Sequence, residues 1–336
     1  MSNSIHVSAE ELHSRMSAAF TRAGLSLQAA TDTADSLTEA ECAGKSSHGL
    51  IRVEYVCTET ERKNPGTVSI EKKEGCFLGI NASGHLAYHP GVIGIEEGSA
   101  MAAESGVTLV GIHNTSHSGM LGFFARRIAG KGYWGLVMAH CTALMAPHGG
   151  GRSVFGTNPI ALGVPRAKSD PLIIDFSPAA TTYGAVSVAR SEARQIRKAV
   201  ALDGRGRPTT DPNAVMDGGT LLPAAEHKGS ALALLVQLVC GPLIGAAALP
   251  DRGTDYGLFF AIIRPDIFQD RGITEREVER VLAAVEDCPP MHGNARVRLP
   301  GEQSSRAIQD AKKNGLDVDR QLWQKAGVFA GLTAAQ

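Results

Sequence analysis

The stretch "FGTNPIALGVPR", residues 155–166, decides how the middle of the chain is read, because a turn containing Gly and Pro leads straight into an apolar run. Its segment "NPIALGV" is typical of a buried strand, and so are "YWGLVMAHC" at 133–141 and "PLIIDFS" at 171–177. Loops rich in Gly and Pro separate these strands, and "DGRGRPTTDP" at 203–212 is an exposed one. The middle of the chain is therefore predicted to be mixed α/β.

Helices are expected towards both ends of the chain. Ser8 and Glu11 form a capping-box pattern at the start of a helix that Gly24 ends, and a second helix follows over about 26–43. The remaining expected elements are strands at 67–73, 76–83, 107–113 and 256–265, and helices at 91–106, 123–130, 274–287, 302–315 and 318–327.

The composition suits one large domain or two to three modest ones, since 43% of the 336 residues are hydrophobic. The net charge of −1 and the lack of a basic tract argue against a nucleic-acid partner. No apolar signal core stands at the start, and the six cysteines include no C-x-x-C pair, so reduced thiols and a cytoplasmic location are expected. The longest apolar run, 231–250, is interrupted by Gln237 and Pro242, which favours a buried helix over a membrane span.

Several common site motifs are absent from the sequence. The chain has no G-x-G-x-x-G, no G-x-S-x-G and no H-E-x-x-H, and "AGKSS" at 43–47 lacks the first glycine of a P-loop. His85 and His89 are four residues apart, as are His113 and His117, but neither pair has an obvious carboxylate on the same face. We therefore predict no metal site.

The stretch "KSSHGLIRVEY", residues 45–55, sets ionisable groups beside aliphatic ones. On a helix, His48 and Arg52 would share a face because they are four residues apart. A histidine near neutral pH can protonate a developing oxyanion or amine, and an arginine can bind a carboxylate with two nitrogens. Ser47 can hydrogen-bond the imidazole. The alternatives are a core histidine and a serine that only caps a helix.

Two further segments are candidates for contact with a phosphate. "TSHSGMLG", residues 115–122, lies between a strand and a helix, and its small residues let backbone N–H groups approach an anion, although an ordinary turn has the same composition. Lys228 stands at the start of the long apolar helix, where the helix dipole disfavours a cation unless an anion compensates.

Eight segments, in this order, resemble the malate/L-lactate dehydrogenase type 2 family: "AGKSSHGLIRV", "SHSGMLG", "APHGG", "FGTNPIALGVPR", "IIDFS", "LDGRGRPTTDP", "HKGSALALLV" and "RLPGE". The combination of "SHG-xx-R" with "FGTNP" is specific, and the chain is most similar to the branch of Δ1-piperideine-2-carboxylate/Δ1-pyrroline-2-carboxylate reductases. The resemblance implies an α/β, non-Rossmann nicotinamide-binding fold. Its core would be a mixed, mostly antiparallel sheet, with helical N- and C-terminal parts.

The resemblance also implies how the chain is divided and assembled. Residues 1–70 and 290–336 would form a helical domain with the His/Arg segment, 71–115 and 225–289 an α/β substrate and dimer domain, and 116–224 the cofactor-binding domain. Family members are homodimers with cofactor clefts near the subunit interface, so a homodimer is expected. The other expected partner is a small carboxylate substrate, with neither nucleic acid nor membrane.

Position by position, the resemblance implies roles for a set of polar and glycine residues. Ser47 looks like the relay serine and His48 like the acid/base, while His117 competes with His48 for that role. Arg52 looks like the carboxylate clamp. The other implied substrate-binding residues are Thr157, Tyr183 and Gly184, and the implied cofactor-binding residues are Ser118, Gly119, Met120, Leu121, Gly122, Asp175, Phe176, Ser177, His227, Lys228, Arg298, Leu299, Pro300, Gly301, Glu302, Gln303 and Ser304.

The sequence departs from the family pattern at a few positions. Imine-reducing members have an aspartate at position 185 that completes a relay, and hydroxy-acid members often have a lysine or arginine there, but this chain has Ala185. "AEHKG" at 225–229 replaces a more usual glycine pair, "SHSGM" lacks the usual aromatic residue, and Gln303 stands where a charged residue is common. Because of these departures, the family resemblance alone does not decide whether Ser47 acts in a proton relay or which substrate the protein uses.

We therefore expect an NAD(P)H-dependent oxidoreductase that transfers hydride to the α-carbon of a small α-imino or 2-oxo acid, with "SSHG" and "HKGSAL" favouring a cyclic imine. The alternative is a 2-hydroxy-acid dehydrogenase of the malate, L-lactate, ureidoglycolate or sulfolactate type. The cofactor would be NADP or NAD, with NADPH favoured. Outside this class stand a hydrolase using Ser47 and His48 and a family member without turnover. The candidate cations for a 2′-phosphate are Arg126, Arg127, Arg190 and Arg194.

Overall fold

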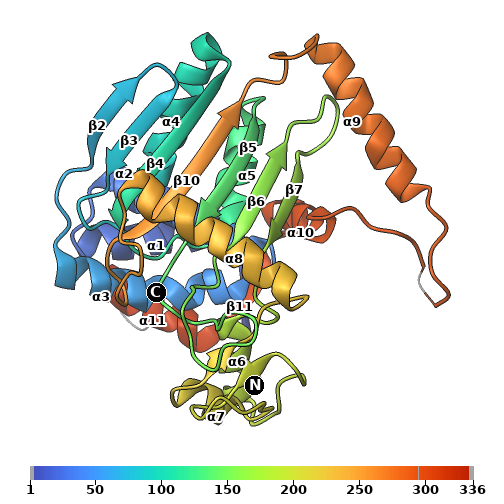
Figure 1. The fold of residues 1–336 in the computed structure, drawn as a ribbon. Helices are drawn as coiled ribbons and strands as arrows, with labels where there is room; N and C mark the ends of the chain where they lie inside the picture. The colour runs from blue at the N-terminus through green and yellow to red at the C-terminus, as the bar shows by residue number, and fades with distance from the viewer. Residues whose placement is uncertain (1–3, 294, 333–336) are drawn as a thin grey trace.

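A seven-stranded sheet forms the centre of the protein in this computed structural model, which describes residues 4–293 and 295–332 (Figure 1). The strand order is β2-β3-β4-β10-β5-β6-β7, and each neighbouring pair is antiparallel except β3 and β4. The predicted mixed, mostly antiparallel core is thus confirmed. The strands are β2 Ser69–Glu74, β3 Phe77–Asn81, β4 Val107–Thr115, β5 Trp134–Ala139, β6 Ile160–Val164, β7 Leu172–Phe176 and β10 Tyr256–Ile263.

Strand β10 lies in the middle of the sheet although it comes late in the chain. Phe260 pairs with Val110 on β4 and with Val137 on β5, and all three side chains are fully buried. Helices cover both faces of the sheet: α4 Tyr88–Ser105 and α5 Leu121–Gly130 on one side, and α8 His227–Cys240 on the other (Figure 1). A strand covered on both faces is apolar throughout, which is why "YGLFFAII" does not alternate.

A second core joins the two ends of the chain. It packs α1 Ala9–Arg22, α2 Leu27–Cys42 and α3 Val53–Lys63 against α11 Arg320–Ala330. The predicted capping box is present, because Ser8 Oγ accepts the Glu11 N–H and the Glu11 carboxylate accepts the Ser8 N–H. The sequence prediction missed a two-stranded antiparallel sheet that pairs β1, Ser4–Val7, with β11, Leu316–Asp319.

The remaining described elements form a small lobe and an arm. The lobe has its own core and contains α6 Tyr183–Ser191, α7 Pro212–Met216, β8 Ala201–Leu202 and β9 Thr220–Leu221. Helix α9, Arg271–Glu286, projects from the body beyond β7, and the chain then returns to α10, Glu302–Asn314, which packs on α2 (Figure 1). The predicted three-part division of the chain stays a prediction.

The stretch 45–55 is not one helix, contrary to our expectation. It forms two 3-10 turns, η1 Ser46–His48 and η2 Leu50–Arg52, before α3 begins at Val53. Gly49 separates the turns, and a Cβ on it would lie 2.0 Å from Glu41 Oε2. The Glu41 carboxylate lies against Gly49 because it accepts a hydrogen bond from the Leu50 N–H at 2.7 Å. The spacing of residues in the sequence does not reveal that the Glu41 side chain packs against Gly49.

Helix α8 and the following 3-10 turn η3, Pro242–Ile244, form the one described segment that is long and apolar enough to cross a membrane by length and composition. The helix instead packs on β5 and β10, with Val236 and Cys240 fully buried. Gln237 is also buried, and it hydrogen-bonds the Ala248 carbonyl at 2.7 Å. These contacts make α8 a layer on the sheet, but Leu234, Leu235 and Leu238 are exposed, so the buried helix that the sequence predicted is buried on one face only.

Candidate active site

The two 3-10 turns bring Ser47, His48 and Arg52 together. Ser47 Oγ lies 2.9 Å from His48 Nδ1, and Arg52 Nε donates to the Ser47 carbonyl oxygen at 2.7 Å. The predicted trio is therefore adjacent in space, although the helix expected to align it is absent. Arg52 uses only Nε in this bond, so its two terminal nitrogens have no hydrogen-bond partner among the described residues.

The pKa of His48 is lowered to about 4, first by burial and then by the positive charges of Arg52 and Lys45. The imidazole is consequently neutral at pH 7. A negatively charged substrate group beside Arg52 would offset part of that positive potential and raise the pKa of His48. The position of the arginine thus couples substrate charge to the protonation of the histidine.

His117 lies opposite His48 in the same site, at a ring-centroid distance of 6.0 Å. It follows β4, and its Nδ1 accepts the Gly119 N–H at 3.0 Å and lies 3.1 Å from the Tyr88 hydroxyl. The pKa of His117 is held well below 6.5 by burial, by Arg52 and by His48. Sequence reasoning missed Tyr88, because α4 begins at this residue and not after Pro90, a proline that the first turn of a helix tolerates.

Gly184 brings the small lobe to the histidine segment. A Cβ on Gly184 would lie 3.2 Å from Ser47 Cβ and 3.6 Å from Ser47 Oγ, so the start of α6 touches the predicted relay serine. The next residue, Ala185, offers only a methyl group, and its N–H is capped by Thr182 Oγ1 at 3.0 Å. Tyr183 lines a neighbouring open pocket whose other walls include residues 143–144, 215–216 and 218–221.

Three predicted cofactor segments meet along β7. Asp175 Oδ2 accepts the Gly122 N–H at 2.8 Å, at the start of α5. Gly301, from the segment 298–304, packs so closely that a Cβ on it would lie 2.4 Å from the Ile173 carbonyl oxygen. The segment 115–122 was expected to place backbone N–H groups against a phosphate. In the structure, the N–H groups of Gly119 and Gly122 donate instead to His117 and Asp175.

The "FGTNP" turn, residues 155–159, forms hydrogen bonds both with the residue after β7 and with α8. Ser177 Oγ donates to the Thr157 carbonyl oxygen at 2.7 Å. Asn158, fully buried, donates to the Ala233 carbonyl and to Gln237 on α8, each at 2.9 Å. Gly156 is required sterically, because a Cβ on it would lie 2.6 Å from Asn158 Oδ1 and 2.6 Å from Cys141 Sγ. The family motif therefore anchors the helix that starts with His227 and Lys228.

The four arginines considered for a 2′-phosphate all have protein partners. Arg126 pairs with Glu39 at 3.2 Å and Arg127 with Asp35 at 3.0 Å. Arg190 donates to Met216 Sδ, and Arg194 pairs with Glu192. Lys45 is the cation that sequence reasoning missed: its charge acts on the pKa of both His48 and Asp175, and its ammonium has no hydrogen-bond or ion-pair partner among the described residues.

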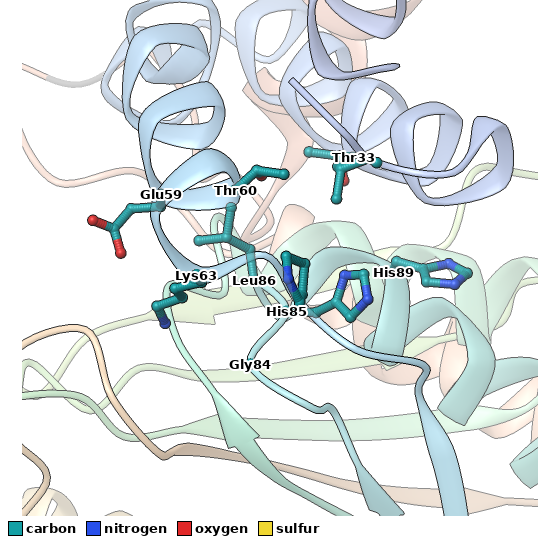
Figure 2. Close-up of a pocket in the computed structure, with 10 residues that line it drawn as sticks. Thr33, Glu59, Thr60, Lys63, Gly84, His85, Leu86 and His89 are labelled. Atoms are coloured by element: carbon teal, nitrogen blue, oxygen red, sulfur yellow. The ribbon is translucent and has the colours of Figure 1, made fainter. Parts of the chain in front are cut away.

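The two histidine pairs weighed as metal ligands have other roles. His85 bonds the Gly66 carbonyl at 2.9 Å, and His89 pairs with buried Asp32 at 2.6 Å. Both rings line a separate pocket between α2, α3 and α4, which contains none of the predicted site residues (Figure 2). His113 pairs with Glu71. Within residues 4–293 and 295–332, no three His, Cys, Asp or Glu side chains gather in a way that could hold a metal.

An arginine with free terminal nitrogens beside two facing histidines forms a candidate site for a small anionic molecule. The family model described as malate/L-lactate dehydrogenase matches residues 7–326, so the chain belongs to that family. It is an NAD(P)-dependent oxidoreductase, as its curated relatives are.

Three of these relatives show the range of activities in the family. The chain is 30% identical to a Δ1-pyrroline-2-carboxylate/Δ1-piperideine-2-carboxylate reductase of Pseudomonas putida, covering 95% of each chain. It is 28% identical to the NAD+-dependent ureidoglycolate dehydrogenase of Escherichia coli K12, covering 95% and 94%. It is 34% identical to an NADP+-dependent (2R)-3-sulfolactate dehydrogenase of Chromohalobacter salexigens, covering 71% and 72%.

A solved structure has the same fold over nearly the whole chain. The crystal structure of Δ1-piperideine-2-carboxylate reductase from Pseudomonas syringae pv. tomato superposes with a TM-score of 0.87 at 26% identity, covering 97% of this chain and 99% of that one. The predicted α/β fold of this family is thus confirmed.

Proposed function

We propose that this protein transfers hydride from a reduced nicotinamide to the α-carbon of a small 2-oxo or α-imino acid. The observation that carries the proposal is the Ser47–His48–Arg52 arrangement facing His117. A second candidate function is a 2-hydroxy-acid dehydrogenase, which would oxidise the hydroxy acid by the reverse hydride transfer. It is favoured by the methyl group of Ala185, because no carboxylate stands at that position to complete an imine-reducing relay.

In this proposal Arg52 holds the substrate carboxylate. Its Nε is tied to the Ser47 carbonyl, which fixes the plane of the guanidinium, and its terminal nitrogens are left to form two parallel hydrogen bonds with a carboxylate. Thr157, Tyr183 and Gly184 would bound the rest of the substrate. We expect a carboxylate fixed in this way to bring the neighbouring α-carbon within reach of the two histidines, whose ring centroids are 6.0 Å apart.

His48 is the proposed acid/base. Ser47 Oγ can either donate to or accept from His48 Nδ1, so the ring keeps its orientation in both protonation states. Reduction places hydride on the α-carbon, moves the π electrons of the double bond to the oxygen or nitrogen, and adds the His48 proton to that atom. A bound nicotinamide supplies the hydride.

The donor set at the end of β7 fits a dinucleotide. The Asp175 carboxylate can accept hydrogen bonds from ribose hydroxyls, and the ammonium groups of Lys45 and Lys228 suit phosphates. The segments 118–122 and 298–304 would complete this site. We keep NADPH as the favoured cofactor over NADH, with the choice to be tested directly.

We further propose a cytoplasmic homodimer that buries the outward face of α8. That face carries Leu234, Leu235 and Leu238, whose exposed fractions are 46%, 47% and 53%. A row of exposed leucines on one helix is typical of a protein–protein interface.

The assay is nicotinamide absorbance loss with NADH and NADPH in parallel. The substrates are Δ1-piperideine-2-carboxylate, Δ1-pyrroline-2-carboxylate, pyruvate and oxaloacetate. Turnover of at least one substrate that disappears in His48→Gln, with cofactor binding retained, supports the proposal. No turnover with any substrate and either cofactor, in the oxidative direction as well, would show that the proposed activity is wrong.

A further inference from the structure

The loop before β10 carries an arginine, Arg252, that the proposed function leaves unused. Resting on that function, we infer that Arg252 and the Tyr55 hydroxyl form a second anion-binding subsite beside the one at Arg52. The substrate class that fits this pair of subsites is a 2-oxo acid, or its 2-hydroxy product, with a second anionic group on the carbon next to the reacting one. That group is a carboxylate or a sulfonate.

A tight turn fixes the position of Arg252. The Thr254 N–H donates to the Asp251 carbonyl oxygen at 3.2 Å, which closes the turn. Gly253 takes φ +75 within it, a conformation that favours glycine. The Gly253 N–H donates to the hydroxyl of buried Tyr256 at 2.8 Å. Arg252 therefore projects from a turn that is anchored on the first residue of β10.

The turn lies at the edge of the sheet where β4 leads into His117. Tyr256 pairs with Thr115, the last residue of β4, and the Tyr256 carbonyl oxygen accepts a hydrogen bond from Thr115 Oγ1 at 2.9 Å. The turn also contacts the last residue of α3, because Lys63 Nζ donates to the Gly253 carbonyl oxygen at 2.5 Å. It thus lies between α3 and the sheet edge that leads to the histidine site.

Tyr55, on α3, connects this turn with the candidate site. Its ring lies edge-on to His117, with the ring centroids 5.8 Å apart, and its hydroxyl has no hydrogen-bond partner among the described residues. Burial is the largest of the causes that raise the pKa of Tyr55 to about 12, so the hydroxyl keeps its proton at pH 7 and can donate to an anion. The positive charges of Arg52 and Arg252 both act on this hydroxyl.

Arg252 is a cation without a counterion in the part of the chain that the structure describes. Its side chain is exposed and forms no hydrogen bond or ion pair there. The Glu59 carboxylate lies next to the turn, 3.8 Å from where a Cβ on Gly253 would stand, but it already binds Arg62 with both oxygens, at 3.1 and 2.7 Å. Arg252 is therefore available to an anionic ligand, as the terminal nitrogens of Arg52 are.

The spacing of the two subsites matches a short diacid. Arg52 precedes α3 and Tyr55 lies in its first turn, three residues later, which is about 4.5 Å along the helix axis. The two acid carbons of an extended four-carbon diacid are about 4 Å apart, since three carbon–carbon bonds of about 1.5 Å join them. Arg52 can therefore bind one acid group while Arg252 and Tyr55 bind the other, and each anion then has its own guanidinium.

The other candidate substrates leave the second subsite without a partner. Pyruvate has a methyl group where the second anion would lie, and a cyclic imine has ring methylenes there. An apolar group at this place would displace water from Arg252 and from the Tyr55 hydroxyl without replacing its hydrogen bonds. We therefore expect the charge at the distal end of the substrate to determine selectivity.

The first test compares substrates in the wild type. We expect kcat/KM for oxaloacetate or 3-sulfopyruvate to exceed kcat/KM for pyruvate by about 10-fold or more, the usual effect of a hydrogen bond to a charged group. The better of the two identifies the second anion as a carboxylate or a sulfonate. Equal or faster turnover of pyruvate or of a cyclic imine would overturn the inference and leave the proposed oxidoreductase function standing.

Three variants assign the selectivity to these residues. In Arg252→Gln we expect the ratio of kcat/KM for the preferred dianion to kcat/KM for pyruvate to fall about 10-fold or more, through KM and not kcat. Tyr55→Phe keeps the ring against His117 and should lower the same ratio about 3-fold or more. Arg276→Gln, at an exposed arginine on α9, is the matched control and should keep the wild-type ratio. An unchanged ratio in Arg252→Gln would overturn the subsite, and one in Tyr55→Phe would remove the hydroxyl from it.

Binding without turnover separates this inference from the proposed function. Isothermal titration calorimetry with succinate and with propionate, in the presence of NADP+ and separately of NAD+, compares a diacid with a monoacid that cannot react. We expect succinate to bind about 10-fold more tightly than propionate, and Arg252→Gln to remove that difference. Equal binding of the two acids to the wild type would overturn the inference, whereas failure of every substrate in the rate assay counts against the proposed function alone.

Discussion

The surroundings of His48 disfavour its protonated form, and this should appear in the pH dependence of the reaction rate. Because its pKa of about 4 lies below the ordinary value of 6.5, the free enzyme holds the ring neutral at pH 7 and only a small fraction is protonated. Reduction needs the protonated ring, whereas oxidation of a hydroxy acid needs the neutral one. The two directions should therefore depend on pH in different ways.

We predict that the reductive kcat/KM rises about tenfold for each pH unit between pH 8 and pH 6, because the protonated fraction of His48 grows tenfold per unit above its pKa. The oxidative kcat/KM should be nearly flat over the same range. Initial rates at subsaturating substrate measure both. A reductive profile that levels off below pH 7 would contradict the low pKa in the free enzyme.

Arg52 should be irreplaceable by lysine in substrate binding. Arg52→Lys keeps the charge but loses both the Nε bond to the Ser47 carbonyl and the two-nitrogen contact with a carboxylate. We expect KM to rise about 10- to 100-fold, since a charged hydrogen bond contributes about 1.5–3 kcal/mol, with a smaller change in kcat. Arg62→Lys, at an exposed ion pair on α3, is the control and should leave KM unchanged. If Arg52→Lys has the same KM as the wild type, Arg52 does not bind the substrate carboxylate with two nitrogens.

Whole elements were predictable from the sequence where the signal is local. The Ser8 capping box, the strands on either side of Gly75 and the apolar run of β10 all depend on neighbouring residues. The pairing of β1 with β11 joins residues about 310 positions apart, and no local pattern encodes it. The break at Gly49 also depends on a group eight residues earlier, the Glu41 carboxylate, and the spacing of 45–55 therefore predicts a helix where the structure has two turns.

The start of α8 shows backbone strain at two residues. Ala225 and Glu226 stand where the family resemblance implied a glycine pair, and both have positive φ, +49 and +55, with ψ −118 at Glu226. A side chain in that conformation costs about 1–3 kcal/mol. The backbone at these two positions is therefore one that glycine would adopt more easily.

We predict that Glu226→Gly stabilises the protein and raises Tm by a few degrees, because glycine adopts this conformation without the Cβ clash. Gln324→Gly, at an exposed position inside α11, should lower Tm, since glycine in a helix interior is destabilising by about 1 kcal/mol. Calorimetric scans of both variants against wild type give the comparison. A lower Tm for Glu226→Gly would show that this backbone is not strained.

At the scale of the molecule, the candidate site lies where three cores meet. The helical part supplies His48 and Arg52, the sheet supplies His117 after β4, and the small lobe brings Gly184 to Ser47. Sequence motifs identified most of these residues but not how they face each other. Tyr88 lies in no motif, and Lys45 lies in the "AGKSSHGLIRV" motif but had no predicted role, because the roles of both residues come from the docking of α4 and η1 against other elements.

The proposed homodimer is also a property of the whole molecule, and it is tested on α8. We predict that Leu235→Glu together with Leu238→Glu converts the dimer to a monomer, because two buried carboxylates would lose their hydration in an apolar interface. Sedimentation velocity gives the mass. Leu27→Glu, at a leucine 73% exposed on α2, is the matched control and should leave the dimer intact.

The same helix starts with His227 and Lys228, and Asn158 ties it to the "FGTNP" turn. Loss of the dimer should therefore raise the KM for the cofactor as well. A monomeric wild type would show that the homodimer proposal is wrong. A dimeric wild type whose mass is unchanged by the two glutamates would instead place the interface on another surface.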